Sequence, residues 1–444
     1  MVLSSSRLIS ASHTNRVTST QLEPMRTNSY HVFCLVALMA SALQSSAQEW
    51  TRFRGPNGTG ISDTKTIPAK WTEKDINWKV ALPGTGHSSP VLWGEKIFLT
   101  STEENPSRIL ILCVNAANGA VLWRKDFPFA PFKKHNFNSF ASSTPTVDAD
   151  RVYVCWSNPD RYTMMTLDHQ GNTLWERNLG TFKSQHGSGT SPIVFNDKVI
   201  LANEQDGDSF LIAMDSKTGE TRWKTPRSST NTCYSTPFIY QPKGQQPAVI
   251  FSSQAHGISA IDPENGTSLW DYSKAFDKRS VASPIVASGL IIGSCGQGGG
   301  QSDYLVAIRP GDVAAGKRPQ LAYELRRAAP YVPTGVAYGD LLFLWDDSLT
   351  ATCLHAPSGE IRWQERVGGD TFGSPVCVDG RLFCVSATGD VVVIAASDQF
   401  HELARNPLGE TCHTTPAVAG GRMYIRTVGH LFSIGGKAKE VSLK

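Results

Sequence analysis

The amino-acid sequence predicts an all-β protein, an eight-bladed β-propeller of four-stranded antiparallel blades whose last blade is closed by an N-terminal strand. Three observations support this prediction: a recurring Gly-to-Trp spacing, a recurring Ser/Thr-Pro pair, and a content of 38 glycines and 25 prolines in 444 residues. Both recurrences have a period in the forties, which is typical of stacked supersecondary units. The composition suits many short strands with tight turns better than long helices or disorder.

The first recurrence is a glycine followed four residues later by a tryptophan. Successive tryptophans lie 52, 48 and 47 residues apart, then 93 apart, and the long interval covers two periods with one degenerate unit between them. One further tryptophan lies 45 residues before the first of these. We interpret these side chains as structural wedges between neighbouring blades. They are Trp78, Trp123, Trp175, Trp223, Trp270 and Trp363.

The second recurrence is a small hydroxyl residue followed by proline, which we place at the start of the first strand of each blade. Proline in that position removes no hydrogen bond from the ladder. Thr334-Gly335 stands for one copy that has lost its proline, so that the sequence has eight units. The other copies are Ser89-Pro90, Thr144-Pro145, Ser191-Pro192, Thr236-Pro237, Ser283-Pro284, Ser374-Pro375 and Thr415-Pro416.

Each pair opens a hairpin, which a third strand and a tryptophan-bearing fourth strand then complete. In the seventh unit, Asp379-Gly380 is a two-residue turn between runs of β-forming residues. The eighth unit supplies three strands up to Ile434, and residues 76–80 have the pattern of its fourth strand. We therefore expect residues 76–80 to complete the last blade and to leave no open edge in the ring.

The sequence divides into four parts. We expect a signal peptide over 1–47 with an over-extended start before Met25, an extended lead-in lying on the ring over 48–70, the propeller over 71–435 and a tail over 436–444. The signal is indicated by an arginine, an apolar stretch of about 12 residues and a small-residue cleavage site. A spanning helix needs about 20 apolar residues. We expect a periplasmic or secreted protein without an integral membrane span.

The net charge bears on the partners of the protein, and the cysteine positions bear on whether it forms disulfides. The formal net charge is +3, and nothing in it indicates a nucleic-acid partner. Eight cysteines follow the predicted cleavage site, scattered at about one per unit inside apolar strand patterns, so we predict buried free thiols. Cys377 faces Leu382 across its hairpin and Cys384 is out of register with Cys377, which disfavours a disulfide there. We expect a monomer.

These markers together resemble the PQQ-like repeat of the quinoprotein alcohol dehydrogenase-like propellers. The Ala-x-Asp-x-x-x-Gly-x-x-x-Trp ending is clearest from Ala213 to Trp223 and from Ala260 to Trp270, and the resemblance covers about residues 71–435. The lead-in from Trp50 to Gly60 resembles the opening of exported propellers of planctomycete-like bacteria. The resemblance implies one of two classes: dehydrogenases that hold pyrroloquinoline quinone (PQQ) over Ca²⁺ in the channel, or non-catalytic scaffolds of the BamB type.

For a quinone dehydrogenase of this superfamily, the resemblance implies a site with a vicinal Cys-Cys disulfide, a stacking tryptophan, calcium ligands and an aspartate base. The sequence has no adjacent cysteines, and only Asp370 and Glu410 are acidic in the segments that precede the first strands. We therefore predict no catalytic, cofactor-binding or metal residues and no cofactor, with PQQ and Ca²⁺ as the alternative. Asp346-Asp347 occupies a turn between two strands, where we expect both carboxylates to be solvated.

The same segments place six ring-bearing side chains around one mouth of the channel. His87 and His413 belong to adjoining units, so they can approach one another and bind a metal or a ligand. The alternative is that such residues cap strand starts and face water. The candidates for ligand binding are His87, His186, Tyr234, Tyr331, Phe372 and His413.

The favoured function is an exported binding or scaffolding module without catalysis of its own. A protein, a polymer or a small ligand would dock on one face of the ring. The alternatives are a PQQ-dependent alcohol or sugar dehydrogenase and a protein that binds carbohydrate or another polymer at the aromatic mouth.

Overall fold

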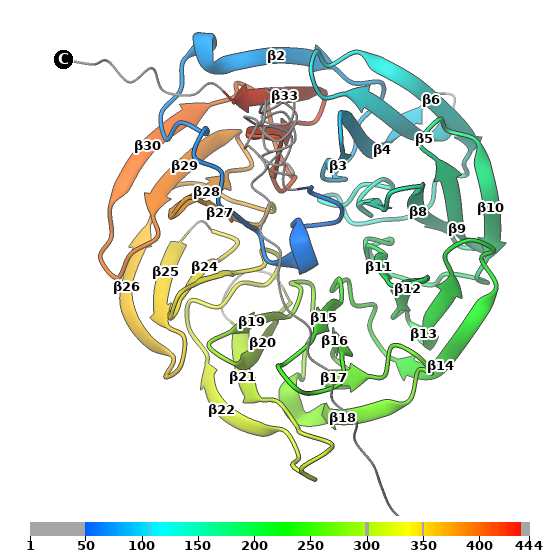
Figure 1. The fold of residues 1–444 in the computed structure, drawn as a ribbon, viewed down its shortest axis with the longest axis vertical. Coiled ribbons are helices and arrows are strands. Elements are labelled where there is room, and N and C mark those ends of the chain that lie inside the picture. Colours follow the sequence, from blue (N-terminus) through cyan, green and yellow to red (C-terminus); the bar gives the residue numbers. More distant parts are fainter. Residues whose placement is uncertain (1–48, 106, 298–301, 349, 437–444) are drawn as a thin grey trace, which may run out of the picture. The chain divides into compact units, whose positions relative to one another are not determined.

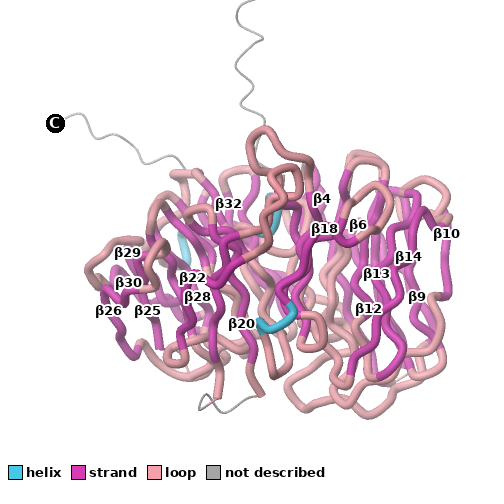
Figure 2. Tube along the Cα trace, turned by 90° about the horizontal axis from the view of Figure 1, so that it is seen from below, coloured by secondary structure: helices cyan, strands magenta, loops and turns pink. Residues whose placement is uncertain are grey.

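The computed structural model describes residues 49–105, 107–297, 302–348 and 350–436, which belong to one compact unit, Ala47–Lys444. The predicted signal peptide and residues 437–444 of the predicted tail lie outside these ranges. Eight sheets surround a central axis (Figure 1), and the edge-on view shows their strands running from one face of the ring to the other (Figure 2). The prediction of an eight-bladed antiparallel propeller is confirmed.

The first four blades follow one another along the chain, each with its first strand nearest the axis. Blade 1 consists of β3 (Val91–Trp93), β4 (Lys96–Glu104), β5 (Ser107–Asn115) and β6 (Val121–Pro128), and blade 2 of β7 (Thr146–Val147), β8 (Arg151–Asn158), β9 (Arg161–Asp168) and β10 (Thr173–Asn178). Blade 3 consists of β11 (Ile193–Phe195), β12 (Lys198–Asn203), β13 (Gly207–Asp215) and β14 (Thr221–Ser229), and blade 4 of β15 (Phe238–Tyr240), β16 (Ala248–Ser253), β17 (Gly257–Ile261) and β18 (Ser268–Tyr272).

The last four blades complete the ring in the same order. Blade 5 consists of β19 (Ile285–Ala287), β20 (Leu290–Cys295), β21 (Tyr304–Arg309) and β22 (Gln320–Leu325), and blade 6 of β23 (Val336–Tyr338), β24 (Leu341–Trp345), β25 (Thr350–His355) and β26 (Glu360–Arg366). Blade 7 contains β27 (Val376–Val378), β28 (Arg381–Val385), β29 (Asp390–Ala395) and β30 (Glu402–Pro407), and blade 8 contains β31 (Ala417–Ala419), β32 (Arg422–Arg426) and β33 (His430–Gly435). Three short 3₁₀ helices are η1 (Pro56–Gly58), η2 (Glu73–Asp75) and η3 (Ser273–Ala275).

Two N-terminal strands join the last blades. Strand β2 (Ile76–Ala81) pairs antiparallel with β33, with Trp78 opposite Ser433, and it is the predicted fourth strand of blade 8. Strand β1 (Ile61–Ser62) pairs in parallel with β27 and gives blade 7 a fifth strand, which the sequence did not predict. Two-residue strands carry no alternation of apolar and polar residues, so pattern reasoning has nothing to detect.

The six predicted wedges lie where one blade meets the next. A Cβ placed on Gly219 of blade 3, which has φ +70°, would lie 2.6 Å from the Trp175 indole of blade 2. Most of the indoles also donate an Nε1–H bond to a carbonyl of the neighbouring turn, as Trp175 does to Ser216 at 3.0 Å. The same bond is made by Trp78, Trp123, Trp223 and Trp363, whereas Trp270 packs on Gly311. In the degenerate fifth unit Tyr323 takes this place, since its ring covers Gly359 and its hydroxyl donates to Ala356 at 2.8 Å.

The apolar core lies in layers between adjacent blades. One layer joins Leu211 and Ala213 of blade 3 to Val249 and Phe251 of blade 4. Both faces of an inner strand are therefore buried, which explains the imperfect alternation of the strand sequences. The eight cysteines of the described residues are buried and free. No helix within the described ranges is long and apolar enough to cross a membrane.

Candidate functional site

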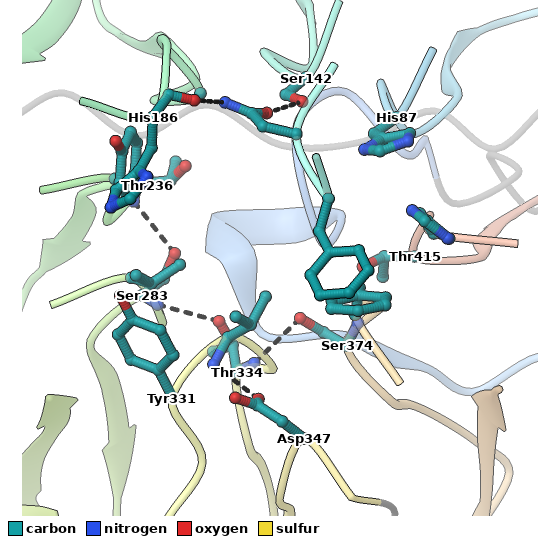
Figure 3. A pocket seen from close by; sticks show the side chains of 18 of the residues that line it. His87, Ser142, His186, Thr236, Ser283, Tyr331, Thr334, Asp347, Ser374 and Thr415 are labelled. Atoms are coloured by element: carbon teal, nitrogen blue, oxygen red, sulfur yellow. Dashed lines mark hydrogen bonds between the residues drawn. The ribbon is translucent and has the colours of Figure 1, made fainter. Parts of the chain in front are cut away.

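At most blade junctions, the hydroxyl residue before the first strand links its blade to the preceding one. The amide of Ser89 in blade 1 donates to the Thr144 hydroxyl of blade 2 at 3.0 Å, and the amide of Thr144 donates to Ser191 at 2.9 Å. Seven blade junctions carry this bond at 2.9–3.1 Å, and Figure 3 shows three of them between Thr236 and Ser374. Sequence reasoning placed these residues at strand starts but missed this role. The signal was the hydroxyl present in every copy.

A segment of the lead-in closes one end of the channel. Figure 1 shows this blue stretch crossing the centre of the ring. Trp50 bridges to Leu92 of blade 1, and the carbonyl of Thr51 accepts the amide of Val147 of blade 2 at 2.8 Å. Phe53 lines the central cavity described below. The channel is therefore a cup with a floor at this end.

Two buried arginines hold this floor in place. The Arg54 guanidinium, 0 % exposed, donates to the carbonyls of Thr334 at 2.9 Å, Gly335 at 2.7 Å and Pro375 at 3.0 Å, which belong to blades 6 and 7. Arg52 donates to the carbonyl of Pro237 in blade 4. Burial lowers the pKa of both guanidinium groups to about 9, so both remain charged at neutral pH. Backbone carbonyls, not carboxylates, compensate these charges.

The cup encloses a cavity of about 690 Å³ on the channel axis. Its wall contains all six candidate residues predicted from the sequence and also the hydroxyl residue of every blade junction. Figure 3 shows His87, His186 and Tyr331 on different sides of this space, with Thr334 and Ser374 at its edge. Most of the wall therefore comes from the loops that precede the first strands, as the sequence analysis placed them, with additions from Phe53, Gln297 and residues 346–348.

Six rings follow one another around one side of the cavity, and we call this set the aromatic belt. His87 and His413 have ring centroids 4.5 Å apart, and Phe372 lies 4.8 Å from His413. The belt continues through Phe137, His135 and His186 at centroid separations of 5.0, 5.4 and 5.1 Å.

Two belt residues were missed from the sequence. Phe137 and His135 lie in the long loop between β6 and β7, and Phe137 of this loop reaches Phe372 in the loop before blade 7. Nothing in the strand pattern marks a residue in the middle of such a loop. Phe137 is 58 % exposed, so its ring forms the outer edge of the belt.

The two predicted tyrosines lie apart from the belt. Tyr234 and Tyr331 line the cavity from the loops before blades 4 and 6, and the hydroxyl of Tyr234 is 3.1 Å from that of Ser184. Burial raises the pKa of Tyr234 to about 12, so this phenol stays neutral. Arg279 lines the same sector and donates from Nε to the carbonyl of Thr232 at 2.8 Å. These hydrogen-bonding groups thus adjoin the His186 end of the belt, since the Ser184 hydroxyl also accepts the amide of His186 at 3.1 Å.

Three histidines of the belt, His87, His413 and His186, are held neutral. The pKa of His87 is lowered to about 3, mainly by burial and also by the charges of His413, Arg426 and Lys134. Burial also lowers the pKa of His413, and burial together with Arg279 lowers that of His186. The Nδ1 of His413 is buried without a hydrogen-bond partner among the described residues. Neutral imidazoles with free ring nitrogens can both donate to and accept from a ligand.

The expectation that both carboxylates of Asp346-Asp347 are solvated is wrong for Asp347. Its Oδ1 accepts the amide of Val332 at 2.9 Å at the edge of the cavity. Burial, with the nearby charges of Asp303 and Asp346, raises the pKa of Asp347 to about 7. Asp346 instead accepts the amides of Ser348 and Thr350 and caps its own turn. The tertiary fold of the preceding loop, absent from the local sequence, covers Asp347.

The residues of this cavity do not fit a quinone held over calcium in the way the resemblance implies. Tryptophan is absent from the described cavity wall. Of its acids, Asp346 and Asp347 are engaged by loop amides, and Asp370 is exposed at the rim. Within the described ranges, no group of three or more His, Cys, Asp or Glu side chains is arranged to hold a metal ion. Glu410 is bound to Thr427 at 2.6 Å and to His430 at 2.8 Å. We derive no reaction step through such a cofactor.

Comparisons with known proteins identify one family and many solved structures with a similar fold. The family model described as outer membrane protein assembly factor BamB matches residues 73–294 and 324–399. The comparison with curated proteins gives no match.

The solved structures show the fold alone, because their identities are low. BamB from Moraxella catarrhalis is 13 % identical with a TM-score of 0.59, and the match covers 82 % of this chain and 98 % of that one. Quinohemoprotein alcohol dehydrogenase from Comamonas testosteroni is 14 % identical with a TM-score of 0.62, and the match covers 91 % of this chain and 83 % of that one. The quinohemoprotein alcohol dehydrogenase ADHIIG from Pseudomonas putida HK5 is 13 % identical with a TM-score of 0.60, and the match covers 88 % of this chain and 81 % of that one.

Proposed function

The chain belongs to the family described as outer membrane protein assembly factor BamB, and we propose that it is an exported binding propeller that receives a ligand in its axial cup. The ligand is a small molecule, a polymer residue or a side chain of a docked protein. In this proposal the propeller is monomeric and performs no catalysis. The observation that carries the proposal is the cup itself, a cavity of about 690 Å³ with the aromatic belt on one side.

The rigidity of the cup supports binding. Hydroxyl-to-amide bonds join the blades at the base of the wall, as at Thr334 and Ser374, and Arg54 fixes the floor. A site that is built before the ligand arrives spends little free energy on ordering its own side chains. Cavities of a few hundred Å³ with apolar rings and a few polar groups are the usual shape of ligand sites.

The side chains of the wall favour binding over chemistry. A serine, threonine or cysteine nucleophile needs an adjacent base, most often a histidine. Among the described residues of the cavity wall, no hydroxyl or thiol is hydrogen-bonded to a histidine ring. The described His–carboxylate pair, His430 with Glu410 at 2.8 Å, joins the start of β33 to the loop before β31 and does not line the cavity.

Export is supported by the apolar segment that ends near residue 43 and by the family. That segment lies outside the described residues, so the proposal rests there on the sequence pattern. Cell fractionation of a tagged full-length chain should place it outside the cytoplasm with residues 1–47 removed. Recovery of the uncleaved chain in the cytoplasm would contradict this part of the proposal.

Dye-linked oxidation separates this function from a dehydrogenase. We expect the purified protein, mixed with PQQ and Ca²⁺, to reduce the dye no faster with alcohols or sugars than without them. Substrate-dependent turnover would overturn the non-catalytic assignment.

A thermal-shift panel of neutral and acidic oligosaccharides and peptides tests binding directly. A ligand at 100 times its Kd should stabilise the protein by about 2.7 kcal/mol. We expect Phe372→Ala and Tyr331→Ala to weaken this shift and Leu122→Ala, on the outer strand β6, to leave it unchanged. Equal shifts in all four proteins would contradict binding in the cup.

A further inference from the structure

A second cavity, of about 640 Å³, adjoins the cup at the rim near blades 2 and 3. It shares His135 and His186 with the aromatic belt, so the two spaces meet at the end of the belt. Three lysines line it, from the loop before β7 and from the loop before β11. We call this space the basic groove, defined by Lys133, Lys134, Lys183, His135, His186 and Asp206.

The groove carries uncompensated positive charge. Its three lysines face one acid, which gives a formal charge of +2 with the histidines neutral. Among the described residues, the lysine ion pairs are those of Lys198, and the three groove lysines make none. The carboxylate of Asp206 already accepts the amide and the hydroxyl of Thr232 at 2.7 and 2.8 Å. An anionic group would meet free ammonium groups here.

The two loops that form the groove are fixed to each other. The amide of His135 donates to the carbonyl of His186 at 3.3 Å, and the Nδ2 of Asn138 donates to His186 at 2.7 Å and to Ser188 at 3.2 Å. Lys134 Nζ lies 5.3 Å from the ring centre of Phe140. The groove therefore has its form without a ligand, and binding does not require these loops to fold.

We propose that the basic groove binds the carboxylate or sulfate groups of an acidic saccharide, one sugar of which packs on the aromatic belt. This inference rests on the proposed binding function and names its ligand class. Rings bind the apolar face of a sugar, and the groove supplies the charge that selects an acidic chain over a neutral one.

The wall of the cup favours a saccharide over an acidic peptide. Sugar hydroxyls both donate and accept, and the wall offers both kinds of partner. The junction hydroxyls accept an amide and keep their own proton for an oxygen of the ligand, as Thr334 and Ser374 do. On the far side Asp370 is exposed at the rim, and Asp346 lies nearby. These carboxylates would repel any anionic chain on that side, so we expect the anionic groups of the ligand on the side of the basic groove.

Fluorescence anisotropy with four labelled probes tests the proposal. They are hexagalacturonate, its fully methyl-esterified form, a sulfated heparin hexasaccharide as a second acidic saccharide, and hexaglutamate. We expect at least one acidic saccharide to bind about 10-fold more tightly than the neutral ester, a difference of about 1.4 kcal/mol. The preference should shrink between 50 and 200 mM NaCl, because salt screens exposed charges.

A charge-matched pair of variants locates the site. The triple change Lys133→Gln, Lys134→Gln, Lys183→Gln should lower affinity for the acidic saccharide about 10-fold and leave the neutral ester unaffected. The control is Lys217→Gln, Lys224→Gln, Lys274→Gln, which removes the same charge outside the groove. We expect this control to bind like the wild type. Thermal unfolding of both variants checks that each is folded.

The other outcomes overturn the inference in distinguishable ways. Equal affinity for acidic and neutral saccharides, or an equal loss of affinity in both triple variants, would show that the basic groove does not bind the ligand. The proposal that the cup binds a ligand would then still stand. Hexaglutamate binding as tightly as the acidic saccharides assigns the groove to an acidic protein segment. If no saccharide binds, the assignment of an acidic saccharide as the ligand is wrong. The thermal-shift panel then decides separately whether the cup binds any ligand.

Discussion

The hydroxyl of Ser89 accepts the amide of Thr415 at 3.1 Å, although 326 residues separate them in the chain. This bond joins blade 8 to blade 1 on the inner side of the ring, and the pairing of β2 with β33 completes blade 8 on the outer side. The ring is therefore closed twice, once by backbone pairing and once by the junction hydroxyls. Both residues are at least 97 % buried, so solvent has little access to the bond.

We expect Ser89→Ala to lower the free energy of unfolding by about 1–3 kcal/mol, because it leaves the buried amide of Thr415 without an acceptor. Ser89→Thr, which keeps the hydroxyl found in other copies, should cost less. Chemical denaturation followed by tryptophan fluorescence measures both. The control is Ser268→Ala on the exposed strand β18, which should stay within about 0.5 kcal/mol of wild type. An equally stable Ser89→Ala protein would show that the junction bonds do not hold the ring together.

We expect Arg54→Met to destabilise the protein by at least about 3 kcal/mol, because three buried carbonyls of blades 6 and 7 lose a charged donor. Hydrogen exchange should also rise in residues 50–62, since β1 and the floor are held by the same segment. The matched control is Arg309→Met at the exposed end of β21. A loss below about 1 kcal/mol would mean that the lead-in is dispensable for the ring.

The wedges allow a double-mutant cycle between blades 2 and 3. Trp175→Ala should cost about 3–5 kcal/mol through lost packing, and Gly219→Ala should destabilise because its new Cβ would lie 2.6 Å from the indole. In the Trp175→Ala background the Gly219→Ala cost should fall to the backbone strain at φ +70°. Denaturation of the four proteins gives the coupling energy. Strictly additive costs would contradict the wedge contact.

The sequence predicted what its repeats encode. The tryptophans and the Ser/Thr-Pro pairs set the number of blades, and the pattern of residues 76–80 predicted the closure by β2. Features set by one tertiary contact were not predictable: β1 is too short to show a pattern, and Phe137 reaches the belt only through the course of its loop. The positions of His87 and His413 were predictable because both precede first strands in adjoining blades.

The pKa of Asp347 is raised to about 7, so we can predict how its contribution to the free energy of unfolding changes with pH. An aspartate whose folded-state pKa lies above its unfolded value of about 3.9 stabilises the fold below that value, and the contribution is lost as pH rises toward 7. The histidines act oppositely, since their lowered pKa values favour the fold at higher pH. The wild-type curve therefore contains both effects, and a variant is needed to separate them.

We expect Asp347→Asn to isolate the carboxylate, because an amide oxygen can still accept the Val332 amide without titrating. Relative to this variant, the wild type should lose about 1–4 kcal/mol of unfolding free energy between pH 4 and pH 8. The exposed Asp370→Asn is the control for removing an acid at the same rim, and its difference from wild type should vary little with pH. A constant difference between wild type and Asp347→Asn would show that Asp347 is solvated in solution, as its sequence context alone suggested.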